Sequence, residues 1–262
     1  MTPPRRIARP ALTYVITAVA VIVVWWVTVR ATGVKAYLLP PPDLIIMKMW
    51  AERASLLKEG AVTAWATVLG FLLSVAVGIP LAMAMTQSRR AYDVGYPLLV
   101  GLQTLPKIAV APLLVVAFGF GLVPKIILVV LVAFFPVVIN AIAGFRSVDE
   151  DLRNLGRILG FNRIAFFWRI GLPHALPAIF AGLKVAMTLA LIGAVVAEFV
   201  GSDSGLGYQL LSASASLDSL LSFSALIALT LLGLFLYAAV ALLEWIFVAS
   251  RRTPEPEPVG GY

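Results

Sequence analysis

Residues 147–177 read SVDEDLRNLGRILGFNRIAFFWRIGLPHALP, and they form the longest strongly charged interruption in an otherwise apolar chain. The stretch opens on Ser147, and Glu150 follows three residues later, which is the spacing of an S-x-x-E capping box. Residues 149–151 are all acidic and would occupy the first helical turn, where the helix dipole favours negative charge. The sequence therefore predicts a short helix here, on a polar loop between two apolar segments.

Gly160 divides this loop into two expected helices. Glycine ends the first helix, and Asn162 is suited to cap the second, which we expect to stop before Leu172 and Pro173. The second helix carries an apolar, aromatic face made of Phe161, Ile164, Phe167, Trp168 and Ile170. Such a face on a basic loop needs a cover, which is either a partner protein or the lipid surface.

The composition of the chain is that of an integral membrane protein in a lipid bilayer. Of its 262 residues, 61% are hydrophobic and 13% are charged, whereas soluble domains carry roughly 25% charged residues. The net charge of +7 does not indicate a nucleic-acid partner, because the basic residues are scattered at the ends of apolar runs. The chain has no cysteine and one histidine, His174, so we expect no disulfide, no metal site and no cofactor.

Six apolar runs predict an all-α protein with six transmembrane helices in one domain, since about 20 residues suffice to cross a bilayer. The first run has 19 uncharged residues, more than a cleaved signal peptide needs, so we expect it to be retained. Pro106, Lys107 and Pro112 interrupt the third run. We expect an interfacial helix at residues 43–58, capped by Asp43, and a disordered tail at 253–262. The approximate spans are 11–29, 61–88, 94–120, 126–145, 178–200 and 223–248.

The basic residues predict which side of the membrane each loop occupies. If both termini are cytoplasmic, twelve basic residues lie inside: Arg5, Arg6, Arg9, Arg89, Arg90, Arg146, Arg153, Arg157, Arg163, Arg169, Arg251 and Arg252. Six lie outside, namely Arg30, Lys35, Lys48, Arg53, Lys58 and Lys125, and two are boundary cases, Lys107 and Lys184. The positive-inside rule therefore favours this orientation.

The loop resembles the cytoplasmic signature of permease subunits of bacterial ATP-binding-cassette (ABC) importers, which is E-A-A, three residues, G, nine residues and I-x-L-P. Gly160 and the sequence from Ile170 to Pro173 have this spacing, whereas the E-A-A triplet is replaced by N-L-G at residues 154–156. The resemblance predicts an ATPase-coupling loop at 147–177, between spans four and five. It assigns the coupling role to Asn154, Leu155, Gly156, Gly160, Phe161, Ile170, Leu172 and Pro173.

Shorter motifs extend the resemblance over most of the chain: LPPP (39–42), LP (105–106), APL (111–113), FGFG (118–121), FFP (134–136), GFRSVD (144–149), AE (197–198) and SGLGY (204–208). They are similar to the branch that imports nitrate, sulfonates, taurine and thiamine-precursor-like compounds. The resemblance implies a type I fold in the bacterial inner membrane, two copies of the permease, ABC ATPase subunits and an extracytoplasmic solute-binding protein. No G-x-x-x-x-G-K-[ST] phosphate loop is present, so ATP hydrolysis is expected in a separate subunit and the chain itself is not an enzyme.

Two charged residues near lipid depth, Lys107 and Glu198, are predicted for the translocation path. A charge at such depth usually faces water, a partner or a functional path. The alternatives are that Lys107 snorkels to the cytoplasmic surface and that Glu198 caps the polar segment 201–208.

Two other function classes remain as alternatives. A membrane-embedded enzyme needs clustered carboxylates, histidines or cysteines in its spans, and only Lys107, Lys184 and Glu198 lie near lipid depth. An ATP-independent channel or secondary carrier often has inverted repeats with matching interrupted helices, and the sequence shows no such pair. Co-purification with an ATPase distinguishes an importer from both alternatives.

Overall fold

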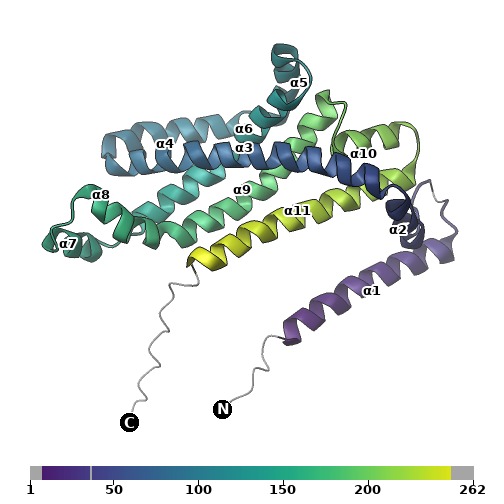
Figure 1. Cartoon of the computed structure of the whole chain (residues 1–262), viewed down its shortest axis with the longest axis horizontal. Coiled ribbons are helices and arrows are strands. Elements are labelled where there is room, and N and C mark those ends of the chain that lie inside the picture. Colours follow the sequence, from purple (N-terminus) through teal and green to yellow (C-terminus); the bar gives the residue numbers. More distant parts are fainter. Residues whose placement is uncertain (1–7, 36, 249–262) are drawn as a thin grey trace, which may run out of the picture.

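The computed structural model describes residues 8–35 and 37–248, and every regular element in these residues is a helix (Figure 1). The all-α class is therefore confirmed, whereas the tail predicted at 253–262 lies outside the described residues. The α-helices are α1 (Ala8–Thr32), α2 (Pro42–Ala51), α3 (Arg53–Gln87), α4 (Arg89–Thr104), α5 (Lys107–Phe118), α6 (Leu122–Arg146), α7 (Glu150–Ile158), α8 (Arg163–Phe166), α9 (Leu172–Gly201), α10 (Leu206–Ala215) and α11 (Ser219–Val248), and one π turn, η1 (Phe167–Gly171), precedes α9.

Four helical stretches are long and apolar enough to cross a membrane: Arg53–Gln87, Leu122–Arg146, Phe167–Gly201 and Ser219–Val248. The pair α4 and α5 passes the same test together but is bent by 82°. Within the described residues the helices thus supply four candidate spans, or five with the bent pair. Since the apolar part found in α1 is the shorter Val19–Thr32, the count of six spans stays a prediction.

The third predicted span, 94–120, is not one helix. α4 ends at Thr104, Leu105 is extended with φ −62° and ψ 132°, and α5 begins at Lys107. The cause is Pro106, which lacks an N–H and disfavours the helical conformation in the residue before it. Pro112, which was also expected to interrupt this run, lies inside α5 without ending it.

The interfacial helix expected at residues 43–58 is also divided. α2 ends at Ala51, and α3 starts at Arg53 and continues without a break to Gln87, so the helix of the second span begins eight residues before the predicted 61. Asp43 is not the cap: Pro41 holds the N-cap position, and Asp43 lies in the first turn. There it accepts hydrogen bonds from Trp26 Nε1 and Arg30, both at 3.1 Å, and so ties α2 to α1.

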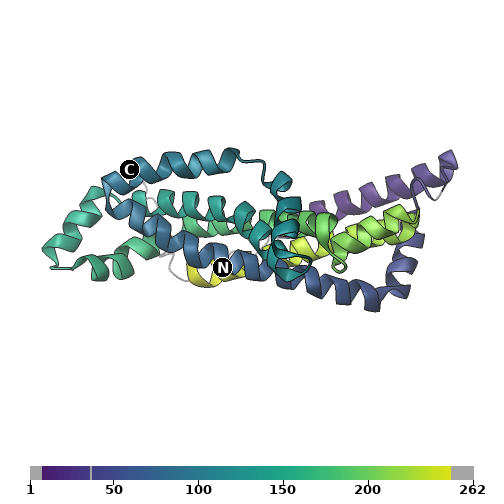
Figure 2. The same ribbon diagram turned by 90° about the horizontal axis from the view of Figure 1, so that it is seen from above.

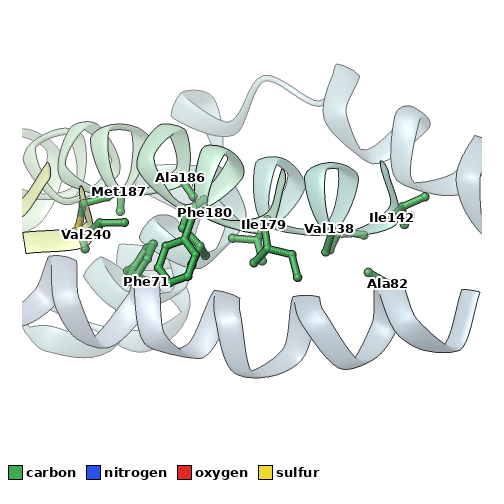
Figure 3. Close-up of a cluster of buried hydrophobic side chains, with 14 of the residues drawn as sticks. Phe71, Ala82, Val138, Ile142, Ile179, Phe180, Ala186, Met187 and Val240 are labelled. Atoms are coloured by element: carbon green, nitrogen blue, oxygen red, sulfur yellow. The ribbon is translucent and has the colours of Figure 1, made fainter. Parts of the chain in front are cut away.

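The core lies where α3, α6, α9 and α11 pack together (Figure 3). Small residues allow this close packing. A Cβ on Gly182 of α9 would come within 2.4 Å of the Asn140 Cβ of α6, so only glycine lets the two backbones approach this closely. The Asn140 side chain donates to Pro136 O of its own helix at 2.8 Å. The labelled core side chains are Phe71, Ala82, Val138, Ile142, Ile179, Phe180, Ala186, Met187 and Val240.

The molecule is elongated, and its two ends differ (Figures 1 and 2). The short helices α7 and α8 lie at one end, which we call the loop end. α2 and the turn between α10 and α11 lie at the other end. The bend between α4 and α5 lies between the two ends, and α1 stands apart from the core helices (Figure 1).

Candidate functional site

The loop between α6 and α9 folds as two short helices that meet at Gly160. Gly160 has φ +69°, a left-handed conformation that other residues adopt only with strain, so the predicted break is confirmed. Asn162 caps α8 as expected, because its Oδ1 accepts a hydrogen bond from Ala165 N at 2.7 Å. Ser147 does not cap α7. Asp149 holds the N-cap position, and the Ser147 hydroxyl donates to Gly144 O of the preceding helix at 2.8 Å.

The second loop helix does not stop before Leu172. η1 joins α8 directly to α9, so the helix of the fifth predicted span begins well before residue 178. Pro173 does not interrupt it, because it follows directly on the wider π turn η1, in which Leu172 N donates to Phe167 O. A continuous helical path, and no irregular linker, therefore joins the loop to α9.

The residues predicted for ATPase coupling differ in burial and in position on the loop. Gly156 is buried, and a Cβ there would lie 2.6 Å from Phe166 Cδ2, so α7 packs closely on α8. Asn154 and Leu155 lie on the exposed side of α7, next to Ile158, which is 83% exposed. The remaining predicted residues, Phe161, Ile170, Leu172 and Pro173, lie beside the second helix and at its junction with α9.

Apolar side chains are exposed at the loop end, and a cavity lies between the loop and the core helices. Leu155 is 47% exposed, and Trp168 is 63% exposed. The cavity, of about 480 Å³, lies between the loop and the end of α3, with Gly156, Phe166 and Met83 in its wall. The loop therefore presents an apolar and basic surface, which no other part of residues 8–35 and 37–248 covers.

Lys107 is the first residue of α5 and lies at the bend of the broken helix pair. Its ammonium group donates a hydrogen bond to Gln103 Oε1, one turn back in α4. The side chain is half-buried and lines a cavity of about 350 Å³ between the bend and the helices α6 and α9. An interrupted helix at membrane depth is tolerated where its backbone is buried or lines a cavity. The residues of the bend, Leu105 and Pro106, line this cavity.

Glu198, near the end of α9, is 1% exposed and belongs to a buried polar network. Its Oε1 lies 3.5 Å from Lys125 Nζ, and the Lys125 ammonium also donates to Ser204 O at 2.9 Å. The Thr63 hydroxyl of α3 donates to Glu198 at 2.9 Å. Lys125, counted among the basic residues outside the membrane, is only 2% exposed, so its charge is held inside the protein and not on its surface.

The same network holds three consecutive backbone amides at the start of α10. Gly205 N donates to Glu59 Oε2 at 2.6 Å, Leu206 N to Thr63 Oγ1 at 2.9 Å, and Gly207 N to Glu198 Oε2 at 2.8 Å. A Cβ on Gly205 would lie 2.0 Å from Glu198 Oε1, so glycine is required there. We call Glu59, Thr63, Lys125, Glu198 and the amides of residues 205–207 the buried polar network.

The structure does not bring Lys107 and Glu198 together. The cavity at the bend includes Lys107 and Val196 but not Glu198, which points into the buried polar network. Sequence reasoning missed Thr63 and Lys125, whose only sequence signal is a polar residue at or beside a long apolar run. It also missed the partner of Lys184, which is Glu244 of α11, with a Nζ–Oε2 distance of 2.6 Å.

Comparisons with known proteins give one consistent result. Residues 74–245 match the family model described as binding-protein-dependent transport system inner membrane component. The formylaminopyrimidine transport permease protein of Halalkalibacterium halodurans is 35% identical over 231 residues, which cover 88% of this chain and 92% of that protein.

Two further relatives are named for other solutes. A Bacillus subtilis permease protein named for aliphatic sulfonates transport is 35% identical, with 90% of this chain and 87% of that protein covered. The taurine transport system permease protein of Escherichia coli is 30% identical over 81% of both chains.

Among solved structures, a chain of the inward-facing MetNI methionine ABC transporter superposes with a TM-score of 0.63 at 17% identity. The match covers 76% of this chain and 97% of the other, and it shows a shared fold.

Proposed function

Because the chain belongs to the family of binding-protein-dependent transport system inner membrane components, we propose that it forms the translocation path for a small anionic or polar solute. It is a permease subunit of an ABC importer, with the fold of the MetNI permease. The family match over residues 74–245 carries this conclusion, because those residues include the bend, the loop and most of the buried polar network. The names of its relatives suggest an aliphatic sulfonate, taurine or a formylaminopyrimidine-like thiamine precursor as the solute, and the sequence motifs add nitrate as a further expectation.

The family implies partnership with an ABC ATPase and a solute-binding protein, and we assign the ATPase contact to the loop end. The exposed apolar side chains of Leu155, Ile158 and Trp168 suit a cleft on another protein, and arginines flank them. α8, η1 and α9 are continuous, so closure of the ATPase dimer would move α9 as a rigid body. ATP hydrolysis then takes place in the separate subunit, and this chain transmits the motion.

In the complex, two copies of this permease enclose the path. Lys107 lies at the bend beside the path, while Glu198 stabilises the start of α10 at the far end. The orientation has both termini and the loop end in the cytoplasm of a bacterial inner membrane. Two features support it: the excess of arginines in the predicted cytoplasmic segments, and the course of α1 and α11, which begin and end toward the loop end (Figure 1).

Gly160→Val tests the coupling role. Valine in the left-handed conformation costs about 1–3 kcal/mol, so the loop changes shape while the spans remain folded. We expect the variant to reach the membrane but to lose ATP-dependent uptake in proteoliposomes that contain the permease, its ATPase and its binding protein.

Gly33→Val is the matched control. Gly33 also has a left-handed φ of +62°, and a Cβ at either glycine would meet no atom of this chain within 4 Å. The control therefore imposes the same backbone strain far from the loop, and it should keep the ATPase bound and the uptake intact. Normal uptake by Gly160→Val would exclude the loop as the coupling element.

A further inference from the structure

The cavity at the bend between α4 and α5 has one charged group, and the rest of its wall is apolar. Lys107 is the only charged or polar side chain among its lining residues. Ile108 of α5, Leu128 and Val132 of α6, and Ile192 of α9 are among the apolar residues facing it. The volume of about 350 Å³ is at the lower end of the range for small-molecule sites, so a small ligand fits.

We propose that this cavity binds an amphipathic monoanion, with its anionic headgroup at Lys107 and its short apolar body against α6 and α9. This inference rests on the proposed function, and it identifies the solute class as short alkanesulfonates. Lys107 is also the first residue of α5, so the positive end of the helix dipole adds to the ammonium charge at the headgroup position.

Gln103 positions the ammonium group of Lys107 from one helical turn back. Its amide oxygen accepts the hydrogen bond from Lys107 and so orients the ammonium group, although Gln103 itself is not among the residues that line the cavity. The three N–H donors of the ammonium group suit the several acceptor oxygens of a sulfonate.

The same wall disfavours two of the other expected solute classes, inorganic anions such as nitrate and zwitterions such as taurine. A hydrated inorganic anion would give up its bound water on entering the cavity, and apart from Lys107 the wall has no side chain to replace those hydrogen bonds. A zwitterion such as taurine would place its ammonium group against apolar side chains or beside Lys107, and either position is unfavourable. An apolar chain, in contrast, gains free energy with every methylene group that leaves water.

The test measures equilibrium binding of a sulfonate series to the permease–ATPase complex in phosphatidylcholine nanodiscs, with empty nanodiscs as the background. Affinity should rise from methanesulfonate to 1-butanesulfonate by up to about fourfold for each methylene group. Taurine should bind more weakly than ethanesulfonate, which has the same carbon chain without the ammonium group. A flat series in the wild-type complex would overturn the proposal without any variant.

Variants separate the two ends of the site. Lys107→Met should weaken 1-butanesulfonate binding by about tenfold or more, because it removes the charged donor, whereas Lys107→Arg should retain most of the affinity. Ile192→Ser should reduce the dependence on chain length and leave methanesulfonate binding unchanged. Lys58→Met removes an exposed cation of α3 and is the matched control, with no expected effect. Equal binding by wild type and Lys107→Met would contradict the proposal.

Two further arms identify the source of any failure. If anionic phosphatidylglycerol in the nanodisc abolishes sulfonate binding, the cavity holds a lipid headgroup and the proposal is wrong. ATP-dependent uptake by the reconstituted complex is measured separately. A complex that transports a solute but gives a flat sulfonate series refutes this inference alone, whereas a complex without ATP-dependent transport of any solute refutes the proposed function.

Discussion

Replacing Glu198 by glutamine tests what the buried polar network contributes. Glu198 and Lys125 are 1% and 2% exposed, and their charged atoms lie 3.5 Å apart. At an effective dielectric constant of about 20, two unit charges at this distance attract by about 5 kcal/mol. Glutamine has nearly the same shape but no charge, so it leaves the Lys125 ammonium buried with Ser204 O as its acceptor. Breaking one side of a buried ion pair typically costs about 3–5 kcal/mol.

The effect should appear first at the start of α10. The amides of Gly205, Leu206 and Gly207 donate to Glu59, Thr63 and Glu198, so their protection from solvent reports on the network directly. Hydrogen exchange measures this protection. If opening becomes easier by 3–5 kcal/mol, exchange at these amides should accelerate by roughly two to three and a half orders of magnitude.

A double variant distinguishes lost charge pairing from lost packing. Lys125→Met alone leaves the carboxylate unpaired and should be similarly harmful, whereas Glu198→Gln combined with Lys125→Met removes both charges. The combined effect should therefore be much smaller than the sum of the two single effects. Lys58→Met, at an exposed position of α3, is the control and should leave exchange unchanged.

Two results would refute this reasoning. Exchange at residues 205–207 that is unchanged in Glu198→Gln would mean that the carboxylate charge does not hold α10. Single effects that simply add in the double variant would mean that Glu198 and Lys125 act independently, despite the 3.5 Å between their charged atoms.

Three shorter predictions concern topology, packing and docking. In intact cells, a membrane-impermeant maleimide should label a cysteine at Ser204 but not one at Arg157, and labelling at Arg157 would reverse the orientation. Lys184→Met should lower the free energy of unfolding of the purified chain by about 1–3 kcal/mol, because Glu244 loses its partner at 2.6 Å. A denaturation midpoint equal to that of the wild type would argue against this. Ile158→Asp should leave the fold intact, because the side chain is 83% exposed, but should weaken ATPase binding about tenfold or more in pull-down titrations. Undiminished binding would exclude this face of α7 from the interface.

Local sequence chemistry predicted several features of the structure correctly. The break at Pro106 follows from a residue that lacks an N–H and restricts its neighbour, and the turn at Gly160 follows from a residue that tolerates positive φ. Asn162 caps α8 for a similarly local reason, since its side chain accepts from an amide three residues on. In each case the deciding interaction lies within a few residues of the chain, so one sequence contains it.

Other local expectations failed because a second local interaction competed with the predicted one. Ser147 matched the capping-box spacing, but its hydroxyl donates to a carbonyl of α6, and Asp149 begins the next helix instead. Leu172 and Pro173 read as a helix end, yet η1 joins α8 and α9 into one helical path. Spacing alone does not show which neighbouring acceptor or helix a residue joins.

The sequence by itself determined the apolar runs, the polar loop and the two local breaks, because these depend on residue type and short-range periodicity. Tertiary structure decided which charges are neutralised and where. Glu198 lies 3.5 Å from Lys125 and accepts from Thr63 across 135 residues, and Lys184 meets Glu244 across 60 residues. Neither pairing has a sequence signature, since the cost of burying a charge requires a partner but does not specify which one. The packing of α3, α6, α9 and α11 selects the partner by placing the two groups within a few ångströms of each other.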